Sequence, residues 1–204
     1  MKYYSIVTSI IISRQLSLFF CLMARPNNHK KLIVILDVDG TLVATARYCC
    51  PLDDADRAAA DFVIEYSSSD NYVYQLRADL PEFLAWLFEN CRVVVWSDNP
   101  RDHVERLVRN IFGSFASQIE RIYDERHVIV AHVGYGEMGR VKPIDIVAKE
   151  LEGPCVLIDD RDCNINYNPG RALLISSLNF ELELPRSVDN ELQRIMAEIK
   201  RIAC

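Results

Sequence analysis

The sequence predicts an α/β protein with a three-layer, Rossmann-like parallel sheet, a small β-hairpin insert and no large cap domain. Two observations support this fold class. Several short, continuous apolar runs are typical of strands buried on both faces, and the segments between these runs have the spacing of amphipathic helices. Strands that alternate with helices in this way imply right-handed crossovers and a parallel sheet covered on both faces.

Four apolar runs are the predicted strands of the sheet. They span residues 32–36, 91–97, 153–160 and 171–176. The first run, "LIVIL", is bounded by charged residues at both ends, which is typical of a strand buried within a parallel sheet.

The segments between the strands are predicted to be helices. Residues 80–90, "LPEFLAWLFEN", place Pro81 in the first turn and apolar residues on one face. The segment 99–112 begins with Asn99 as the predicted N-cap and Pro100 just inside the helix. Two more helices are predicted at residues 142–151 and 187–203.

One segment departs from this alternation. Residues 62–77, "FVIEYSSSDNYVYQLR", are two aromatic and β-branched runs around a polar turn, which predicts an antiparallel hairpin inserted after the first strand. Such an insert is too small to be a domain, but it is long enough to line a site. We therefore expect one domain over residues 31–204 and a separate N-terminal extension over residues 1–30.

The first 24 residues are apolar but are interrupted by Arg14 and Gln15. The longest uninterrupted stretch, residues 3–13, is shorter than the ~20 residues that a membrane-spanning helix needs. No stable membrane span is therefore expected. A signal peptide, a weak anchor, and a leader with Met23 as an alternative start are three interpretations that the sequence leaves open.

Composition excludes some classes of function. The net charge of −6 gives no reason to expect direct binding to nucleic acid or to an anionic membrane. The seven cysteines form no C-x-x-C pair, which argues against a zinc or redox motif. They are interpreted as reduced thiols of a cytoplasmic or nuclear protein, and we expect a monomer.

Neither the histidines nor Cys155 is assigned to a functional site. The histidines have no ligand-like spacing and are expected at the surface or in loops; they are His29, His103, His127 and His132. Cys155 and Arg161 fit the C-x₅-R spacing of cysteine-dependent phosphatases, but the two acids between them would repel a phosphate. Cys155 is therefore predicted to be a core residue.

The stretch "VILDVDGTLV" (34–43) places two carboxylates directly after the first strand. Asp37 and Asp39 are two residues apart, so they are expected to point the same way, and Gly40 allows a sharp turn after them. In open α/β sheets, ligands bind beyond the carboxyl ends of the strands. The pair is therefore expected to face a ligand.

Polar residues also follow the other predicted strands. Ser97 ends the second strand and Asn99 follows it, Asp159 and Asp160 end the third, and Lys142 stands at the start of a helix. Crowded carboxylates repel one another unless a divalent cation neutralises them, and Mg²⁺ binds carboxylates together with phosphate oxygens. Helix N-termini, a hydroxyl and an ammonium suit phosphate. The residue types therefore predict Mg²⁺-dependent phosphoryl transfer.

The order of these elements resembles a known superfamily. "DVDGT", then Ser97, then Lys142, then "DD" after an apolar strand resembles the four motifs of the haloacid dehalogenase superfamily, over residues 31–176. The segments "YVYQLRADLPEFLAWLFENCRVVVWSDN" and "NYNPGRALLI" resemble the FCP/SCP-type, or NLI-interacting-factor-like, protein phosphatases. Those enzymes act on phosphoserine in the RNA polymerase II tail.

The chain also departs from that family. The family more often has D-L-D-E-T at the first motif, Thr at the second, and Ser-Pro where this chain has Arg161 and Asp162. "DVDGT" together with "IDDR" is also similar to polynucleotide 3′-phosphatases. These departures concern the substrate more than the chemistry, and they leave the role of Arg161 open between reading the substrate and pairing with an acid.

The resemblance implies a role for each residue of the site. Asp37 would be the nucleophile that forms an aspartyl-phosphate, and Asp39 the general acid and base. The metal ligands would be Asp37, the Asp39 carbonyl, Asp159 and Asp160. The phosphate-binding residues would be Thr41, Ser97, Asn99 and Lys142, with Asn99 expected first as a helix cap.

The resemblance also implies a phosphorylated protein or peptide as substrate. Two alternatives remain. The same chemistry could act on a nucleic-acid 3′-end or on a small phosphorylated metabolite, or the chain could be an inactive scaffold that binds phosphoproteins.

Overall fold

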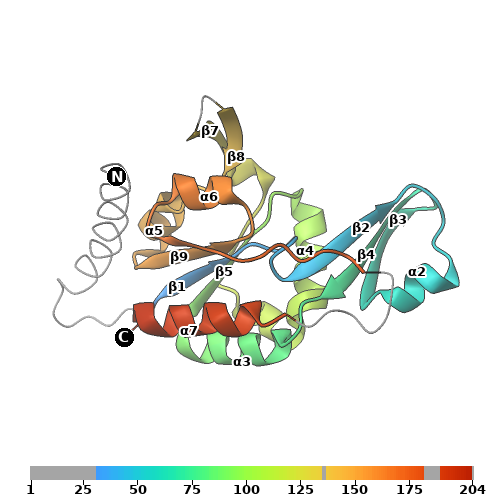
Figure 1. Cartoon of the computed structure of the whole chain (residues 1–204), viewed down its shortest axis with the longest axis horizontal. Helices are drawn as coiled ribbons and strands as arrows, with labels where there is room; N and C mark the ends of the chain where they lie inside the picture. Colours follow the sequence, from blue (N-terminus) through green and yellow to red (C-terminus); the bar gives the residue numbers. More distant parts are fainter. Residues whose placement is uncertain (1–30, 135–136, 182–188, 204) are drawn as a thin grey trace, which may run out of the picture.

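The computed structural model describes residues 31–134, 137–181 and 189–203. Its main sheet has five parallel strands in the order β10-β9-β1-β5-β6. Figure 1 labels the three central ones, β9, β1 and β5. The strands are β1 (Ile33–Leu36), β5 (Arg92–Trp96), β6 (Arg121–Tyr123), β9 (Cys155–Asp159) and β10 (Ala172–Leu174). The predicted fold class is confirmed, and four of these strands lie within the four predicted runs.

The helices cover both faces of this sheet. They are α3 (Leu80–Asn90), α4 (Arg101–Phe112), α5 (Asp145–Leu151), α6 (Asp162–Tyr167) and α7 (Glu191–Ala203). Val34 and Leu36 of β1 belong to a core cluster with α3, α4 and α7, whereas Ile33 and Ile35 belong to a second cluster with Val147 of α5. Alternate β1 side chains thus enter different layers, as the period of a strand requires.

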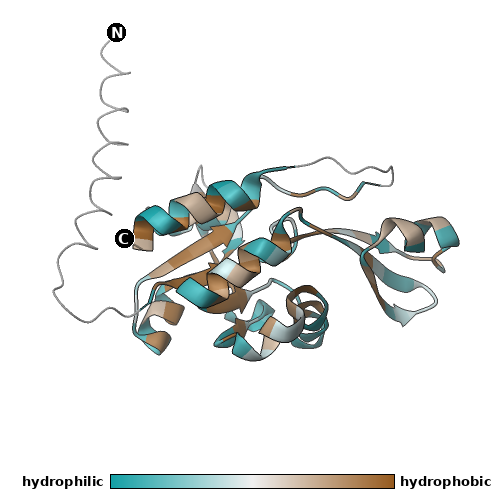
Figure 2. Cartoon of the chain, turned by 90° about the horizontal axis from the view of Figure 1, so that it is seen from below, coloured by the Kyte–Doolittle hydropathy of each residue, from teal (hydrophilic) through white to brown (hydrophobic). Residues whose placement is uncertain are grey.

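Hydropathy follows the same layers. Figure 2 shows strands of the main sheet that are hydrophobic along their length, beside helices that carry both hydrophobic and hydrophilic turns. Among the largest fully buried side chains of the described residues are four from β1 and β5: Ile33, Ile35, Leu36 and Trp96.

The insert is larger than the predicted hairpin. Residues 62–77 do form an antiparallel pair, β3 (Phe62–Ser67) and β4 (Asp70–Leu76), but β2 (Val43–Tyr48) completes a three-stranded sheet in the order β2-β4-β3. A short helix, α2 (Asp54–Ala59), joins β2 to β3. This sheet projects to one side of the main sheet (Figure 1). Because β2 begins two residues after Thr41, the insert starts directly at the acid motif.

A second hairpin was not predicted. β7 (Ile129–Gly134) pairs with β8 (Glu137–Val141), and Lys142 follows β8 directly. The predicted leader at residues 1–30 lies outside the described residues. Among the residues that the structure describes, no helix combines the length and the apolar character needed to cross a membrane.

Two predictions about α4 are wrong. Asn99 does not cap the helix, because the N-cap is Pro100 and no side chain caps this end. His103 does not lie at the surface: it is buried, and its ring nitrogens contact the Tyr66 hydroxyl at 2.7 Å and the Tyr74 hydroxyl at 2.8 Å. Both tyrosines belong to the insert, so the packing of the insert on α4 buries His103.

His103 should make stability depend on pH. Burial lowers its pKa below the usual value, although the nearby carboxylates of Asp39 and Asp102 oppose this shift. Unfolded histidine titrates near pH 6.5. Below that pH the unfolded chain binds a proton at His103 more readily than the folded chain does. The contribution of His103 to the free energy of unfolding is therefore constant above about pH 6.5 and falls as the pH decreases below it.

We expect the melting temperature of the wild type to fall more steeply from pH 7 to pH 5 than that of His103→Gln. Circular dichroism melts at several pH values measure both slopes, and other titrating groups cancel in the comparison. Equal slopes would contradict the assignment to His103.

Candidate active site

The site lies where three strands end side by side. β1 pairs with β5 on one side and with β9 on the other, and Leu36 is level with Val95 and Ile158. Asp37 follows β1, Ser97 follows β5, and Asp159 is the last residue of β9. Parallel pairing therefore brings these three polar residues to one edge of the sheet, as the sequence predicted.

A tight loop follows Asp37. The backbone N–H groups of Thr41, Leu42 and Val43 all donate to the Val38 carbonyl, at 2.8–3.2 Å, and Gly40 has a φ of +77°. Residues other than glycine rarely adopt this left-handed conformation. A Cβ at Gly40 would also lie 2.8 Å from Cγ of Asp160 and closer still to its Oδ2. Gly40 is thus required both for the turn and for the space that Asp160 occupies.

A buried arginine supports this loop. Arg77, which is 2 % exposed, donates to the Gly40 carbonyl at 2.8 Å and to the Ser176 carbonyl at 2.6 Å, and it pairs with Asp189 at 3.2 Å. The sequence analysis missed this role. Arg77 connects the acid loop to the segment before α7.

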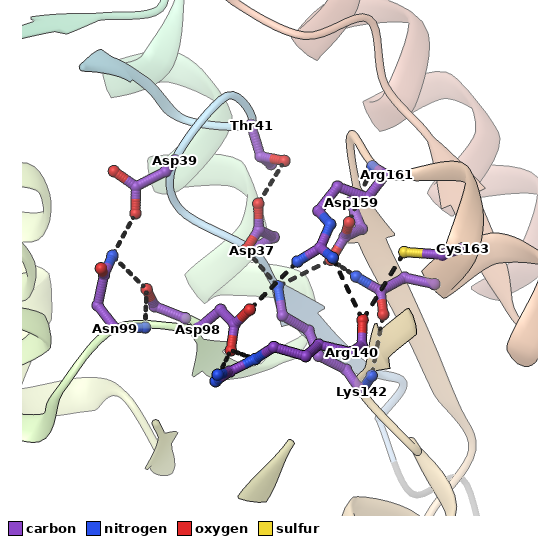
Figure 3. A network of polar contacts seen from close by, with 12 residues as sticks. Asp37, Asp39, Thr41, Asp98, Asn99, Arg140, Lys142, Asp159, Arg161 and Cys163 are labelled. Carbon is purple, nitrogen blue, oxygen red and sulfur yellow. Dashed lines mark hydrogen bonds and ion pairs between the residues drawn. The ribbon is translucent and has the colours of Figure 1, made fainter. Parts of the chain in front are cut away.

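Asp37 is buried between two donors. The Lys142 ammonium donates to its Oδ1 and the Thr41 hydroxyl donates to its Oδ2 at 3.1 Å (Figure 3). Burial raises the pKa of Asp37, and the charge of Lys142 opposes that shift. Burial alone would lower the pKa of Lys142, but Asp37 and Asp159 outweigh it and raise this pKa. Lys142 is therefore an ammonium held between two carboxyl groups.

Asp159 is fully buried and held from three sides. Its Oδ2 accepts from Lys142 Nζ at 2.8 Å and from Asn164 Nδ2 at 2.9 Å, and its Oδ1 accepts from the Arg161 N–H at 2.9 Å. Asn164, in α6, also accepts from the Lys142 N–H at 2.9 Å. Sequence reasoning missed Asn164 because it did not predict α6.

Three carboxylates are placed to hold a cation. One oxygen each of Asp37, Asp159 and Asp160 lies within 4.8 Å of the others. Asp160 Oδ1 is buried without a hydrogen-bond partner among the described residues. A buried carboxylate oxygen without a donor is costly unless a cation binds it. These oxygen donors fit Mg²⁺.

Asp39 has a different environment. It is half-buried, and one oxygen accepts from Thr45 Oγ1 at 2.8 Å. The other oxygen accepts from Asn99 Nδ2 at 2.8 Å (Figure 3). Thr45 belongs to β2, which the sequence did not predict. The Asn99 side chain is thus directed at Asp39, and Asn99 lies one residue before the N-cap of α4, Pro100. The carboxylates of Asp37 and Asp39 thus differ in burial and in charge environment.

Ser97 is buried and next to Asn99. Its Oγ accepts from the Asn99 N–H at 3.3 Å and from Asn99 Nδ2 at 3.1 Å. Both contacts use lone pairs, so the hydroxyl proton can be donated to a phosphoryl oxygen. The structure therefore brings together every residue predicted for the site.

Cys155 plays no part in this site. It is a buried residue of β9, and burial raises its pKa to about 11. A thiol with such a pKa is not a nucleophile near neutral pH. The prediction that Cys155 is a core residue is confirmed.

The fold and the acidic edge of its sheet define the class: a phosphatase of the haloacid dehalogenase type. The model of the family described as NLI interacting factor-like phosphatase matches residues 32–203, and the chain belongs to that family. The predicted resemblance is confirmed. At the level of the family, the predicted enzyme class, phosphoric monoester hydrolases, is confirmed as well.

Two solved structures share the fold. One is the fission yeast RNA polymerase II CTD phosphatase Fcp1, in a variant bound to beryllium fluoride, at 14 % identity and a TM-score of 0.50 over 85 % of this chain and 50 % of that one. The other is Fcp1 described as an essential RNA polymerase II CTD phosphatase, at 13 % identity and a TM-score of 0.51 over 95 % of this chain and 52 % of that one. This chain spans about half the length of both. No curated protein matches the chain.

Proposed function

We propose that this chain is a Mg²⁺-dependent phosphatase that forms an aspartyl-phosphate on Asp37 and acts on phosphoserine or phosphothreonine in proteins. The observation that supports it is the contrast between the two acids of the motif. Asp37 is buried against Lys142, whereas Asp39 is half-buried and held by two neutral donors. Two carboxyl groups in such different environments suit two different roles.

In the first step, a carboxylate oxygen of Asp37 attacks phosphorus and the bond from phosphorus to the leaving oxygen breaks. Asp39 donates a proton to that oxygen, which leaves as an alcohol. In the second step, a water molecule attacks the phosphorus of the aspartyl-phosphate. Asp39 accepts its proton, and phosphate and the Asp37 carboxylate are released. The Thr45 hydroxyl can donate to Asp39 or accept from it, so it suits both protonation states.

Other residues would hold the phosphoryl group. Lys142 and Ser97 would donate to its oxygens, and Thr41, which donates to Asp37, would orient that carboxylate. Mg²⁺ would be held by Asp37, Asp159, Asp160 and, by the resemblance, the Asp39 carbonyl, and it would reduce the repulsion between carboxylate and phosphate.

A protein substrate is supported by the family description and by the neighbours, which are described as phosphatases of the RNA polymerase II CTD. The net charge of −6 disfavours a nucleic-acid 3′-end. A small metabolite and an inactive phosphoprotein scaffold are the remaining alternatives. A nuclear or cytoplasmic location and a monomeric state are part of the same proposal.

Metal removal tests this function. We expect hydrolysis of p-nitrophenyl phosphate with Mg²⁺, a fall of more than about tenfold in EDTA, and recovery when Mg²⁺ is returned. Equal rates in EDTA would contradict the proposal. A panel of phosphoserine peptides, 3′-phosphorylated oligonucleotides and sugar phosphates then separates the substrate classes, and peptide binding without turnover would support the scaffold.

A further inference from the structure

Three charged side chains form a cluster beside the candidate site, and they include Arg161, whose role the sequence left open. Arg140 donates to Asp98 Oδ1 through Nε at 3.1 Å and through Nη2 at 2.5 Å. Arg161 donates to Asp98 Oδ2 through Nη1 at 3.2 Å (Figure 3). We call Asp98, Arg140 and Arg161 the arginine rim.

Each member of the arginine rim is next to a residue of the site. Asp98 lies between Ser97 and Asn99, and Arg140 is two residues before Lys142. Arg161 follows Asp160, and its own backbone N–H donates to Asp159. The arginine rim therefore draws one side chain from each of three segments that supply the site.

The guanidinium groups retain donors. Each has five N–H donors. Among the described residues, Arg140 uses two of them on Asp98, and Arg161 uses one on Asp98 and one, at 3.3 Å, on the Arg140 carbonyl. Two arginines and one aspartate leave a net charge of +1. The arginine rim can thus still bind an anion, and a guanidinium matches a carboxylate or phosphate with two parallel hydrogen bonds.

Exposure argues against a purely structural role. The side chains of Arg140 and Arg161 are 49 % and 42 % exposed, and that of Asp98 is 27 % exposed. Ion pairs this exposed contribute little to stability. A ligand, by contrast, can reach the N–H donors of such exposed side chains without any rearrangement of the fold.

We propose that the arginine rim binds a second anionic group of a peptide substrate: an acidic or phosphorylated side chain close in sequence to the reacting phosphoserine. This inference rests on the proposed function. The centre of the site cannot bind that second anionic group, because, among the described residues, it holds four carboxylates and only one ammonium, that of Lys142. A Mg²⁺ ion bound there would be used by the reacting phosphate. The arginine rim is the adjacent region where positive charge is in excess.

The test compares phosphoserine peptides of otherwise neutral sequence with peptides that carry one glutamate at each position in turn beside the phosphoserine. We measure the ratio of kcat/KM for the acidic peptide to that for the neutral one. In the wild type we expect this ratio to reach about three to ten at one or two positions, mainly through a lower KM.

The variants Arg140→Gln and Arg161→Gln should each bring this ratio toward one. Asp98→Asn raises the net charge of the arginine rim, so it should keep or increase the ratio. The matched control is Arg171→Gln, because Arg171 is 40 % exposed and paired with Asp145 at 2.7 Å but lies at the opposite end of β10 from the site. It should leave the ratio unchanged.

Three results would overturn the inference. The first is an active wild type without a preference for glutamate, and the second is a preference that survives both arginine variants. The third is a ratio that falls in Asp98→Asn as it does in the arginine variants, because that would mean that the ion pairs only hold the structure together. Preference for a 3′-phosphorylated oligonucleotide over every peptide would overturn the assignment to peptides. Failure of the proposed function is distinct, because the wild type would then not hydrolyse p-nitrophenyl phosphate in Mg²⁺.

Discussion

Asp37→Asn is expected to lower kcat for p-nitrophenyl phosphate by on the order of 10⁴-fold or more, with the fold intact. The amide oxygen of asparagine is not a nucleophile toward phosphorus, so no aspartyl-phosphate can form. Asparagine keeps the shape of the side chain: its oxygen can accept from Lys142, and its amide N–H can donate to the Thr41 hydroxyl. Lys142 also keeps Asp159 as a partner. Steady-state kinetics measure the loss, and circular dichroism checks the fold.

Asp39→Asn is the matched control, because it makes the same small change two residues away. This variant keeps the nucleophile but loses both the acid of the first step and the base of the second. Because p-nitrophenolate leaves without being protonated, the first step can still proceed with p-nitrophenyl phosphate. The second step then has no base, so the variant should accumulate a phosphorylated form that Asp37→Asn cannot make. Intact-mass measurement after an acid quench detects that form. Mg²⁺-dependent turnover that persists in Asp37→Asn would show that another group attacks phosphorus.

The main sheet could be predicted because its central strands are buried on both faces. Burial of that kind produces an apolar run such as residues 32–36, which can be recognised from its own sequence without reference to any other segment. β6 has only three residues and begins with the exposed Arg121, so it leaves no such run. β2 was missed for a related reason: its sequence, "VATARY", has no continuous apolar run, and it becomes a strand by pairing with β4.

The same distinction separates the site residues. Asp37, Ser97 and Asp159 could be predicted because parallel strands bring their carboxyl ends to one edge. Thr45, Arg77 and Asn164 could not, because each reaches the site from an element whose position depends on tertiary packing.

Local rules fail where the tertiary structure offers a stronger partner. The helix-capping rule misassigned Asn99, whose amide has the carboxylate of Asp39 within hydrogen-bond distance. A hydrogen bond to a carboxylate is worth more than one between neutral groups. The expectation for His103 failed similarly, since two tyrosines of the insert cover it.

Gly40→Ala should lower kcat/KM by about 10²-fold and weaken metal binding, although it adds only one methyl group. At a φ of +77° an alanine is strained by about 1–2 kcal/mol, which the fold can tolerate. The larger effect is local: the new Cβ would overlap the carboxylate of Asp160, which must move. Misplacing a catalytic group by about 1 Å can cost about 10²-fold in rate.

Gly113→Ala separates strain from displacement. Gly113 also has a positive φ, +50°, but a Cβ there would meet nothing within 4 Å, and the residue ends α4 on the side away from the site. Both variants should melt at lower temperature than the wild type. Only Gly40→Ala should also lose activity and lose the rise in melting temperature that Mg²⁺ gives the wild type. If Gly40→Ala bound Mg²⁺ as tightly as Gly113→Ala does, Asp160 would not be a ligand, and the cation would have to be held by Asp37 and Asp159 without it.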